Sequence, residues 1–413
     1  MECRPVRWRS GGGAGNRARS RTHFDPRAPQ PTDTPRCPPR RRGGALRDAH
    51  LLRPAYRRLD RSAHPGRGPQ LQRFKHHPGV VSLTGIIGRL APSPTGYLHV
   101  GHARSFLLAW WHVRSRGGRI VLRIEDLDRA RAKPELVDTC LRDLEWLGID
   151  WDGPPTYQSN DLQPYEEALA SLVVSGGAYA CTCSRKEIEV AQSAPHKGGE
   201  LRYAGTCRGR YASVRAAERL ADRAVGLRLR VSSAPLDLDD GVRGPHSTDV
   251  HRDVGDFLLA RRDRTFAYQL AVVVDDARAA VTEVLRGDDL LSSTARQWHL
   301  QRALDLPHPR WYHVPLVVDP AGRRLAKRDR DLALASLRAA GVDPRRLVFW
   351  AARTAGQAVS EELSAPELLR TFDLKGLPEG PVPFGPDEQS YFRGAVPLKD
   401  PLPPPATGSG RSP

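Results

Sequence analysis

Two histidines at the start of a predicted helix have the spacing to bind phosphate. Residues 86–90 (IIGRL) are mostly apolar and residues 91–96 read APSPTG, which predicts a buried strand entering a tight loop. His99 and His102 then stand three residues apart, so they share one face of a first helical turn and can donate to phosphate oxygens. Gly101 leaves room for a flat base. Two exposed histidines are the alternative, which the loop before them disfavours.

Charged residues near the ends of predicted strands could form a pocket for an amino acid. Glu125 directly follows the β-rich residues 120–124, at the position where open parallel sheets bind ligands. A carboxylate there can bind an ammonium group, and Arg89 or Arg286 can clamp a carboxylate through two hydrogen bonds. Tyr268 offers a hydroxyl. Taken alone, Glu125 is more often a loop charge or a helix cap.

Three cysteines have the spacing of a metal site. Cys181 and Cys183 form a C-x-C pair, and Cys207 follows 24 residues after Cys183. Three thiolates suit Zn²⁺ better than a hard cation. The spacing leaves the fourth ligand open, with His196 on a Pro- and Gly-rich loop as one candidate. Three reduced cysteines packed in a small subdomain are the alternative.

The elements that must position these residues form an α/β pattern. Besides the strands at residues 86–90 and 120–124, we predict a helix at residues 105–111 and a strand at residues 316–319. The apolar residues 272–274 predict another strand, and the acidic pair Asp275–Asp276 at its end is expected to support the pocket. A strand, a Gly-bearing loop and a helix start place backbone N–H groups at one phosphate-binding point.

Composition excludes several classes of protein. The 413 residues allow two to three domains, no apolar run approaches the ~20 residues of a membrane span, and six cysteines are too few for a disulfide scaffold. The net charge of +17 is unevenly distributed, because residues 1–78 hold 19 Lys+Arg and 5 Asp+Glu, leaving 45 and 42 in the rest. Any basic RNA-binding surface of the folded part must therefore be local.

Several ordered motifs resemble those of class I glutamyl-tRNA synthetases and their paralogues. Residues 89–104 (RLAPSPTGYLHVGHAR) resemble the family signature, and residues 99–102 match its HIGH motif. The resemblance continues through residues 123–128, 266–271 and 284–290 to about residue 350. It implies an α/β, Rossmann-type class I catalytic domain.

The resemblance also implies roles for individual residues. The residues that would contact glutamate are Arg89, Leu90, Ala91, Pro92, Ser93, Glu125, Tyr268 and Arg286. ATP would be bound by His99, Gly101, His102 and Lys327, of which the two histidines and Lys327 would act in catalysis. In the glutamyl-queuosine paralogues a C-x-C…Y-x3-C arrangement binds one structural zinc, which makes Tyr203 the expected fourth ligand.

Lys327 lies in a degenerate version of the second family motif. Residues 324–328 read RLAKR at the position of the KMSKS loop, and Lys327 matches its second lysine while both serine hydroxyls are lost. A lysine there can neutralise the α-phosphate as pyrophosphate leaves. For an isolated run of this kind, a solvated basic loop would be the default interpretation.

The number of residues after Lys327 distinguishes between two possible functions. Only 86 residues follow Lys327, and we expect part of them to be a disordered tail. The rest are too few for the helical anticodon-binding domain of a full glutamyl-tRNA synthetase. We expect a low-complexity segment that is disordered or an extension (1–78), two halves of the catalytic domain (79–180 and 246–310), a zinc-binding insertion (181–245), a KMSKS-like loop with a helical end (311–372) and a disordered Pro-rich tail (373–413).

Such a core resembles the glutamyl-queuosine tRNA(Asp) synthetases. The resemblance implies that ATP with Mg²⁺ activates glutamate to glutamyl-adenylate, and that glutamate is transferred to queuosine at the wobble position in the anticodon stem-loop of tRNA(Asp). The alternatives are a minimal glutamyl-tRNA synthetase that charges a 3′ end and an inactive RNA-binding paralogue. We expect a cytoplasmic monomer with no membrane partner.

Overall fold

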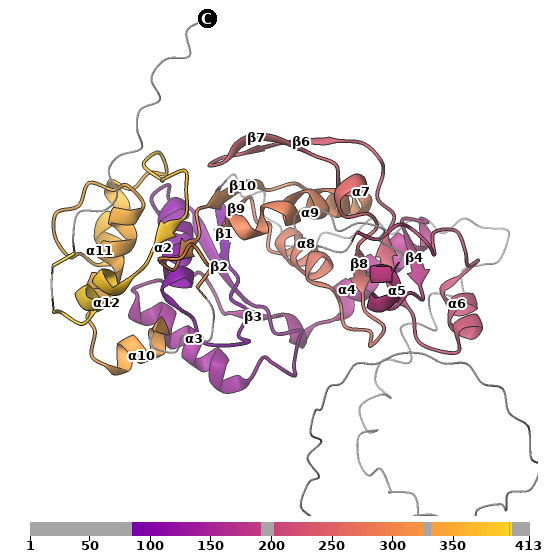
Figure 1. Cartoon of the computed structure of the whole chain (residues 1–413), viewed down its shortest axis with the longest axis horizontal. Helices are drawn as coiled ribbons and strands as arrows, with labels where there is room; N and C mark the ends of the chain where they lie inside the picture. The colour runs from indigo at the N-terminus through magenta and orange to yellow at the C-terminus, as the bar shows by residue number, and fades with distance from the viewer. Residues whose placement is uncertain (1–84, 191–201, 326–331, 396, 399–413) are drawn as a thin grey trace, which may run out of the picture. The chain divides into compact units, whose positions relative to one another are not determined.

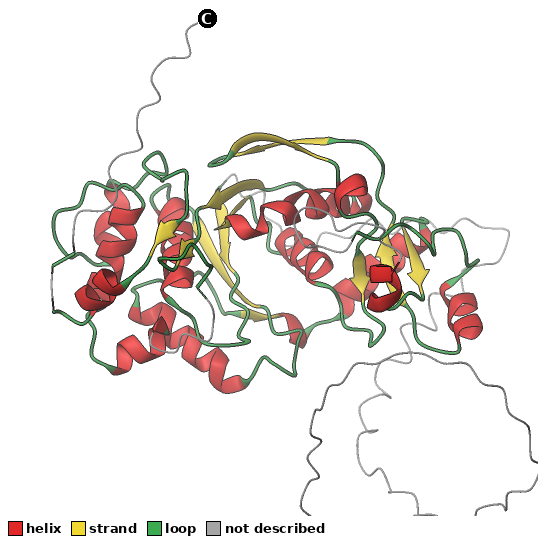
Figure 2. Cartoon of the chain, viewed as in Figure 1, coloured by secondary structure: helices red, strands yellow, loops and turns green. Residues whose placement is uncertain are grey.

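Helices and strands alternate along the chain, as the α/β pattern predicts (Figures 1 and 2). The computed structural model describes residues 85–190, 202–325, 332–395 and 397–398. The predictions for residues 1–78, His196 and Lys327 lie outside the described residues.

Five parallel strands carry the predicted phosphate and amino-acid sites. One sheet has the order β1-β2-β3, and β9 pairs with β10 in a second. Their bounds are Ile87–Leu90 (β1), Arg119–Ile124 (β2), Thr156–Tyr157 (β3), Glu283–Gly287 (β9) and Arg310–Val314 (β10). The backbone N–H of Thr282 donates to Ile87 O at 2.9 Å, and Arg89 Nη1 donates to Leu285 O at 3.3 Å. β1 and β9 therefore lie side by side in the same direction, with their carboxyl ends together.

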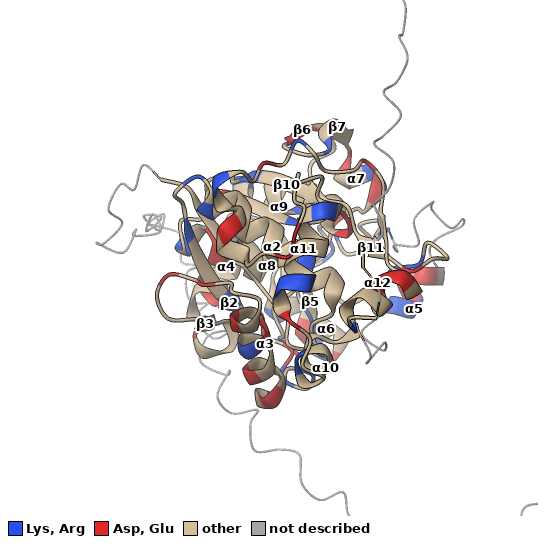
Figure 3. Ribbon diagram, turned by 90° about the vertical axis from the view of Figure 1, so that its left-hand side faces the viewer, with Lys and Arg blue, Asp and Glu red and all other residues tan. Residues whose placement is uncertain are grey.

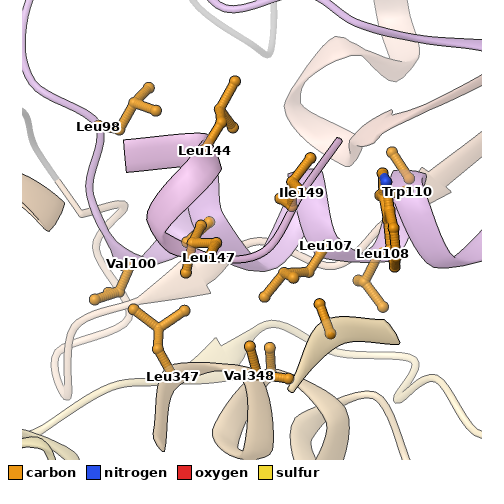
Figure 4. Packing of buried hydrophobic residues seen from close by; sticks show 14 of the residues in the cluster. Leu98, Val100, Leu107, Leu108, Trp110, Leu144, Leu147, Ile149, Leu347 and Val348 are labelled. Carbon is orange, nitrogen blue, oxygen red and sulfur yellow. The ribbon is translucent and has the colours of Figure 1, made fainter. Parts of the chain in front are cut away.

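The helix that follows β1 forms the centre of the first hydrophobic core. α2 (Val100–Arg114) buries an apolar face that includes Leu107, Leu108 and Trp111. Figure 4 shows Leu107, Leu108 and Trp110 near side chains from other parts of the chain, among them Ile149 and Val348. The other helices of this part are α3 (Pro134–Trp146), α10 (Leu334–Ala339) and α11 (Pro344–Thr354), with 3-10 turns η1 (Gln158–Asn160), η2 (Asp288–Leu290) and η4 (Ala365–Arg370). α2 also packs against the strands β1, β2 and β9.

An antiparallel sheet carries the cysteine cluster. Its strand order is β4-β5-β8, and β6 and β7 form a separate hairpin. The strands are β4 (Ala178–Cys181), β5 (Gly226–Leu229), β6 (Leu236–Asp240), β7 (Gly244–Thr248) and β8 (Leu258–Ala260), and the helices are α4 (Gln163–Val174), α5 (Arg185–Val190), α6 (Val214–Ala221) and α7 (Val250–Asp253). The predicted insertion at residues 181–245 was too short, because the sheet starts at residue 178 and includes β8.

The strand predicted at residues 272–274 is wrong. α8 (Tyr268–Arg278) spans this run, and α9 (Leu291–Leu304) packs against it. Residues 269–276 are all buried, so α8 is buried on every side over these turns. A short apolar run of this kind has no periodicity that separates a buried strand from a buried helix.

The tail predicted to be disordered at residues 373–413 is folded over most of its described part. β12 (Val382–Pro383) pairs in parallel with β11 (Val317–Val318), and α12 (Pro386–Phe392) follows. Phe384 and Phe392 pack against Trp350 with ring centroids 5.4 and 5.9 Å away. The prolines on which that prediction rested, at residues 401 and 403–405, lie outside the described residues. Pro383 ends β12 and Pro386 lies in the first turn of α12, where no N–H is needed.

Charges of both signs are spread over the described elements (Figure 3). This distribution agrees with the small net charge of the sequence after residue 78. Within the part that the structure describes, no helix combines the length and the apolar character needed to cross a membrane.

Phe392→Ala should destabilise the protein by about 3–5 kcal/mol, because it empties a buried position in the aromatic cluster with Trp350. Urea unfolding monitored by tryptophan fluorescence measures this change. The exposed neighbour Arg393 provides the control, and Arg393→Ala should change the free energy of unfolding by less than about 0.5 kcal/mol. Equal stability of the two variants would contradict the folded assignment of α12.

Candidate active site

The two histidines lie together at the start of α2. His99 is the N-cap, and its Nδ1 accepts from the backbone N–H of Gly101 at 3.1 Å. His102 Nδ1 accepts from the backbone N–H of His99 at 3.2 Å, and the ring centroids are 3.7 Å apart. Because both Nδ1 atoms are acceptors, each neutral ring carries its proton on Nε2, the nitrogen that can donate to phosphate. A Cβ at Gly101 would lie 3.0 Å from His99 Cε1, so glycine allows this close packing.

The flank that follows the KMSKS-like loop lies beside these histidines. The backbone N–H of Leu334 donates to Leu98 O at 2.8 Å, and Ala333 forms a bridge with His99. On the other flank, Arg324 pairs with Asp289 at 2.6 Å. The role of Lys327 itself stays a prediction.

The loop after β1 contacts the residue after β2. Ser93 Oγ donates to Glu125 Oε2 at 3.0 Å, and the backbone N–H of Glu125 donates to Pro92 O at 3.0 Å. Leu90 is 1% exposed and belongs to the hydrophobic core, so only its backbone can face a ligand. Ala91 is partly buried in the same loop.

Buried charges beneath this loop form one network. Arg123 Nη1 donates to Asp276 Oδ1 at 2.6 Å, and its Nη2 donates to Glu125 Oε1 at 3.3 Å. Asp276 also lies 3.7 Å from Arg89 Nε, and Asp275 lies 3.9 Å from Arg123 Nε. Burial raises the pKa of Glu125, while the charges of Arg123 and Arg89 oppose that rise. Asp275 and Asp276 thus pair with the buried arginines from a helix, and their support of an amino-acid pocket stays a prediction.

Arg123 is a residue that the sequence interpretation missed. It is 3% exposed within β2, next to Glu125. The available signal was an arginine inside a run otherwise expected to be buried, because a buried charge requires an opposite charge nearby.

Arg286 lies in β9, beside the same pocket. Its Nε donates to His313 Nε2 at 3.0 Å and its Nη2 donates to Thr294 Oγ1 at 2.9 Å. Its side chain is buried, and Nη1 has no hydrogen-bond partner in the described part of the chain. Tyr268 begins α8 and is 38% exposed. Partial burial raises the pKa of Tyr268, and the nearby charge of Arg286 counteracts this rise.

The cysteine cluster brings together ligand atoms that could hold a metal ion. The Sγ atoms of Cys181, Cys183 and Cys207 lie within 4.8 Å of one another, and the Cys183–Cys207 distance is 3.5 Å. Tyr203 Oη lies 3.5 Å from Cys181 Sγ and 3.8 Å from Cys183 Sγ. Zn–S bonds of about 2.3 Å and Zn–O bonds of about 2.0 Å place neighbouring ligand atoms about 3.5–3.8 Å apart. Arg228 donates to Cys181 Sγ at 3.3 Å, which would offset part of the thiolate charge.

Residues 85–381 match the family described as tRNA synthetases class I (E and Q), catalytic domain. The fold is also similar to two solved structures, a glutamate-tRNA synthetase from Elizabethkingia anophelis (24% identity, TM-score 0.65, 75% of this chain and 70% of that one) and a glutamate tRNA ligase from Elizabethkingia meningosepticum in complex with its amino acid (25%, 0.65, 74% and 68%). The chain therefore belongs to the family of class I tRNA synthetases.

Curated relatives narrow this assignment within the family. A glutamyl-Q tRNA(Asp) synthetase from Symbiobacterium thermophilum is 44% identical over 308 residues, which cover 72% of this chain and 95% of the relative. One from Deinococcus radiodurans is 47% identical over 293 residues, with 69% and 95% covered. These relatives place the chain in the glutamyl-Q branch of the family.

Arg123→Met should destabilise the protein by about 3–5 kcal/mol, because three carboxylates would lose their shared buried cation. Without it, burial raises the pKa of Glu125 and Asp275 further above their unfolded values. The destabilisation should therefore be largest at pH 7–8 and smaller near about pH 5, where protonation removes the unpaired charge. Urea unfolding across this pH range measures the effect.

Arg131 provides the matched control for Arg123. It is 66% exposed and pairs with Asp128 at 2.6 Å. Arg131→Met should cost less than about 1 kcal/mol at every pH. A pH-independent loss in Arg123→Met would show that packing rather than charge dominates.

Proposed function

We propose that this chain activates glutamate with ATP and transfers it to queuosine in the anticodon stem-loop of tRNA(Asp). The observation that supports the proposal is that Tyr268 lies within electrostatic reach of Glu125, Arg89 and Arg286, which stand on or directly after the parallel strands β1, β2 and β9. The His99–His102 pair starts α2, the helix that follows β1. The relatives named glutamyl-Q tRNA(Asp) synthetase supply the identity of the acceptor.

Glutamate carries one ammonium and two carboxylate groups, and the pocket offers opposite charges for both kinds. Glu125 can accept from the ammonium group. The unpartnered Nη1 of Arg286 can donate to a carboxylate. Arg89 and Ser93 complete the same wall, because Ser93 orients Glu125 and Arg89 is buried beside Asp276.

Activation requires no general base. An α-carboxylate oxygen of glutamate attacks the α-phosphorus of ATP in line, the bond to the bridging oxygen breaks, and pyrophosphate leaves. His99 and His102 donate to phosphate oxygens where negative charge develops, Lys327 contributes a further cation, and Mg²⁺ accompanies the nucleotide. In the second step a queuosine hydroxyl attacks the carbonyl carbon of the adenylate and AMP leaves.

We also propose that Cys181, Cys183, Tyr203 and Cys207 hold one structural Zn²⁺. Two ligands lie at the end of β4 and two in the segment of residues 203–207, so the ion would tie these segments together. A closed set of four protein ligands favours a structural rather than a catalytic role. We further propose that the protein acts as a cytoplasmic monomer.

The acceptor is tested by charging with radiolabelled glutamate. We expect label in queuosine-containing tRNA(Asp), no label in tRNA(Asp) without queuosine, and pyrophosphate exchange that depends on glutamate and ATP. Label at the 3′ end of tRNA(Glu) would instead identify a minimal glutamyl-tRNA synthetase. Absence of exchange in the folded, metal-replete protein would favour an RNA-binding paralogue.

The metal is tested by elemental analysis of protein purified without chelators. The wild type should contain one zinc per chain, and Cys183→Ser should lower both the zinc content and the melting temperature. Cys140→Ser is the control, because Cys140 is buried in α3, away from the cluster. It should retain the zinc. A zinc-free wild type, or equal zinc content in the two variants, argues against the site.

A further inference from the structure

Arg286 is held through a histidine and not through a carboxylate. Its Nε donates to His313 Nε2 at 3.0 Å, and Thr294 Oγ1 lies 3.2 Å from the same nitrogen. Two donor groups can share that nitrogen only if it carries a lone pair. The proton of the ring must therefore lie on Nδ1.

Asp240 fixes this tautomer from the other side of the ring. His313 is completely buried in β10, and its Nδ1 lies 2.6 Å from Asp240 Oδ2. Although burial raises the pKa of Asp240, its hydrogen bonds with His313 and Arg243 lower it to about 2, so the carboxylate is charged. Burial lowers the pKa of His313, so the ring is neutral. A charged carboxylate facing a neutral ring holds the proton on Nδ1.

The hairpin of β6 and β7 brings Asp240 to this position. Asp240 Oδ1 accepts from the backbone N–H groups of Val242 at 3.0 Å, Arg243 at 2.9 Å and His313 at 3.0 Å. Gly241 donates from its backbone to Trp311 O at 2.8 Å, and β6 runs beside β10 in Figure 1. A Cβ at Gly241 would lie 2.2 Å from Tyr312 Cε1, so only glycine lets the turn approach β10 this closely.

We propose that Asp240 and His313 are positioning residues that orient the guanidinium of Arg286 so that its Nη1 meets an anionic group of the amino-acid substrate. This inference rests on the proposed binding of glutamate beside Arg286. Nη1 is the nitrogen left over when His313 and Thr294 have engaged the other two. Because His313 is neutral, Arg286 keeps its full positive charge for the substrate.

Asp240→Asn tests these hydrogen bonds by changing the tautomer of His313. The amide can keep one oxygen for the backbone N–H groups, but it presents NH₂ to His313 Nδ1. The ring proton then moves to Nε2, where it opposes the N–H of Arg286. An aspartate-to-asparagine substitution in the catalytic triad of serine proteases inverts a histidine tautomer in the same way. We expect the Kd and KM for glutamate to rise about 10- to 100-fold, with kcat and the KM for ATP changed less than about threefold. Calorimetry measures the Kd and pyrophosphate exchange measures the rate.

Asp239→Asn is the matched control. Asp239 neighbours Asp240 on β6 and is exposed, so its substitution makes the same change in net charge without touching His313. It should bind glutamate like the wild type. Nitrogen NMR of the imidazoles provides a structural readout, in which His313 should be protonated on Nδ1 in the wild type and on Nε2 in Asp240→Asn.

Two His313 variants cover the case in which Asp240→Asn does not fold. The amide of His313→Gln can donate to Asp240 and accept from Arg286, so it should keep glutamate affinity within about fivefold of the wild type. His313→Leu has neither group and should lose about 10- to 100-fold. Equal glutamate affinity in both variants, or an unchanged Kd in folded Asp240→Asn, would overturn the inference. A wild type that binds glutamate but never exchanges pyrophosphate would refute the proposed activation and leave the positioning role standing.

Discussion

The structure depends on burying arginines and carboxylates together near the carboxyl ends of the parallel strands. Arg89, Arg123 and Arg286 are each at most 6% exposed, and Asp276 is 5% exposed among them. Unpaired ions at such depth would cost several kcal/mol each, so the elements that bring β1, β2, β9 and α8 together must supply the partners. The apolar faces of α2 and α8 hold these elements in place, and the pocket can form only where both conditions are met.

Local patterns in the sequence predicted the parts of the site that depend on local structure. His99 and His102 share one helical turn, Glu125 directly follows a strand, and the cysteines pair at short spacing, so in each case a few residues determine the geometry. The mostly apolar residues 86–90 and 120–124 likewise correspond to β1 and β2. The family motifs then connected these pieces, and the class I fold that they implied is confirmed by the match over residues 85–381.

What the sequence could not supply depends on contacts between distant segments. Asp240 and His313 are separated by 73 positions, and neither has a motif around it that indicates the other. Asp276 appeared to follow a strand, because burial on every side of α8 removes the periodicity that identifies a helix. Phe384 and Phe392 in the segment of residues 382–392 pack against Trp350, which lies far from them in the sequence. Composition does not show this contact, and by composition the segment resembled a disordered tail.

Arg123 and Arg286 have different kinds of partners, and these partners indicate a structural role for Arg123 and a binding role for Arg286. Arg123 pairs with Glu125, Asp275 and Asp276, so carboxylates of the protein itself compensate its charge. Arg286 contacts a neutral imidazole, a hydroxyl and a backbone carbonyl, which fix its orientation and leave its charge available. A carboxylate in place of His313 would hold the guanidinium equally well and would compete with an anionic substrate. The intervening histidine therefore lets Asp240 orient Arg286 without neutralising it directly.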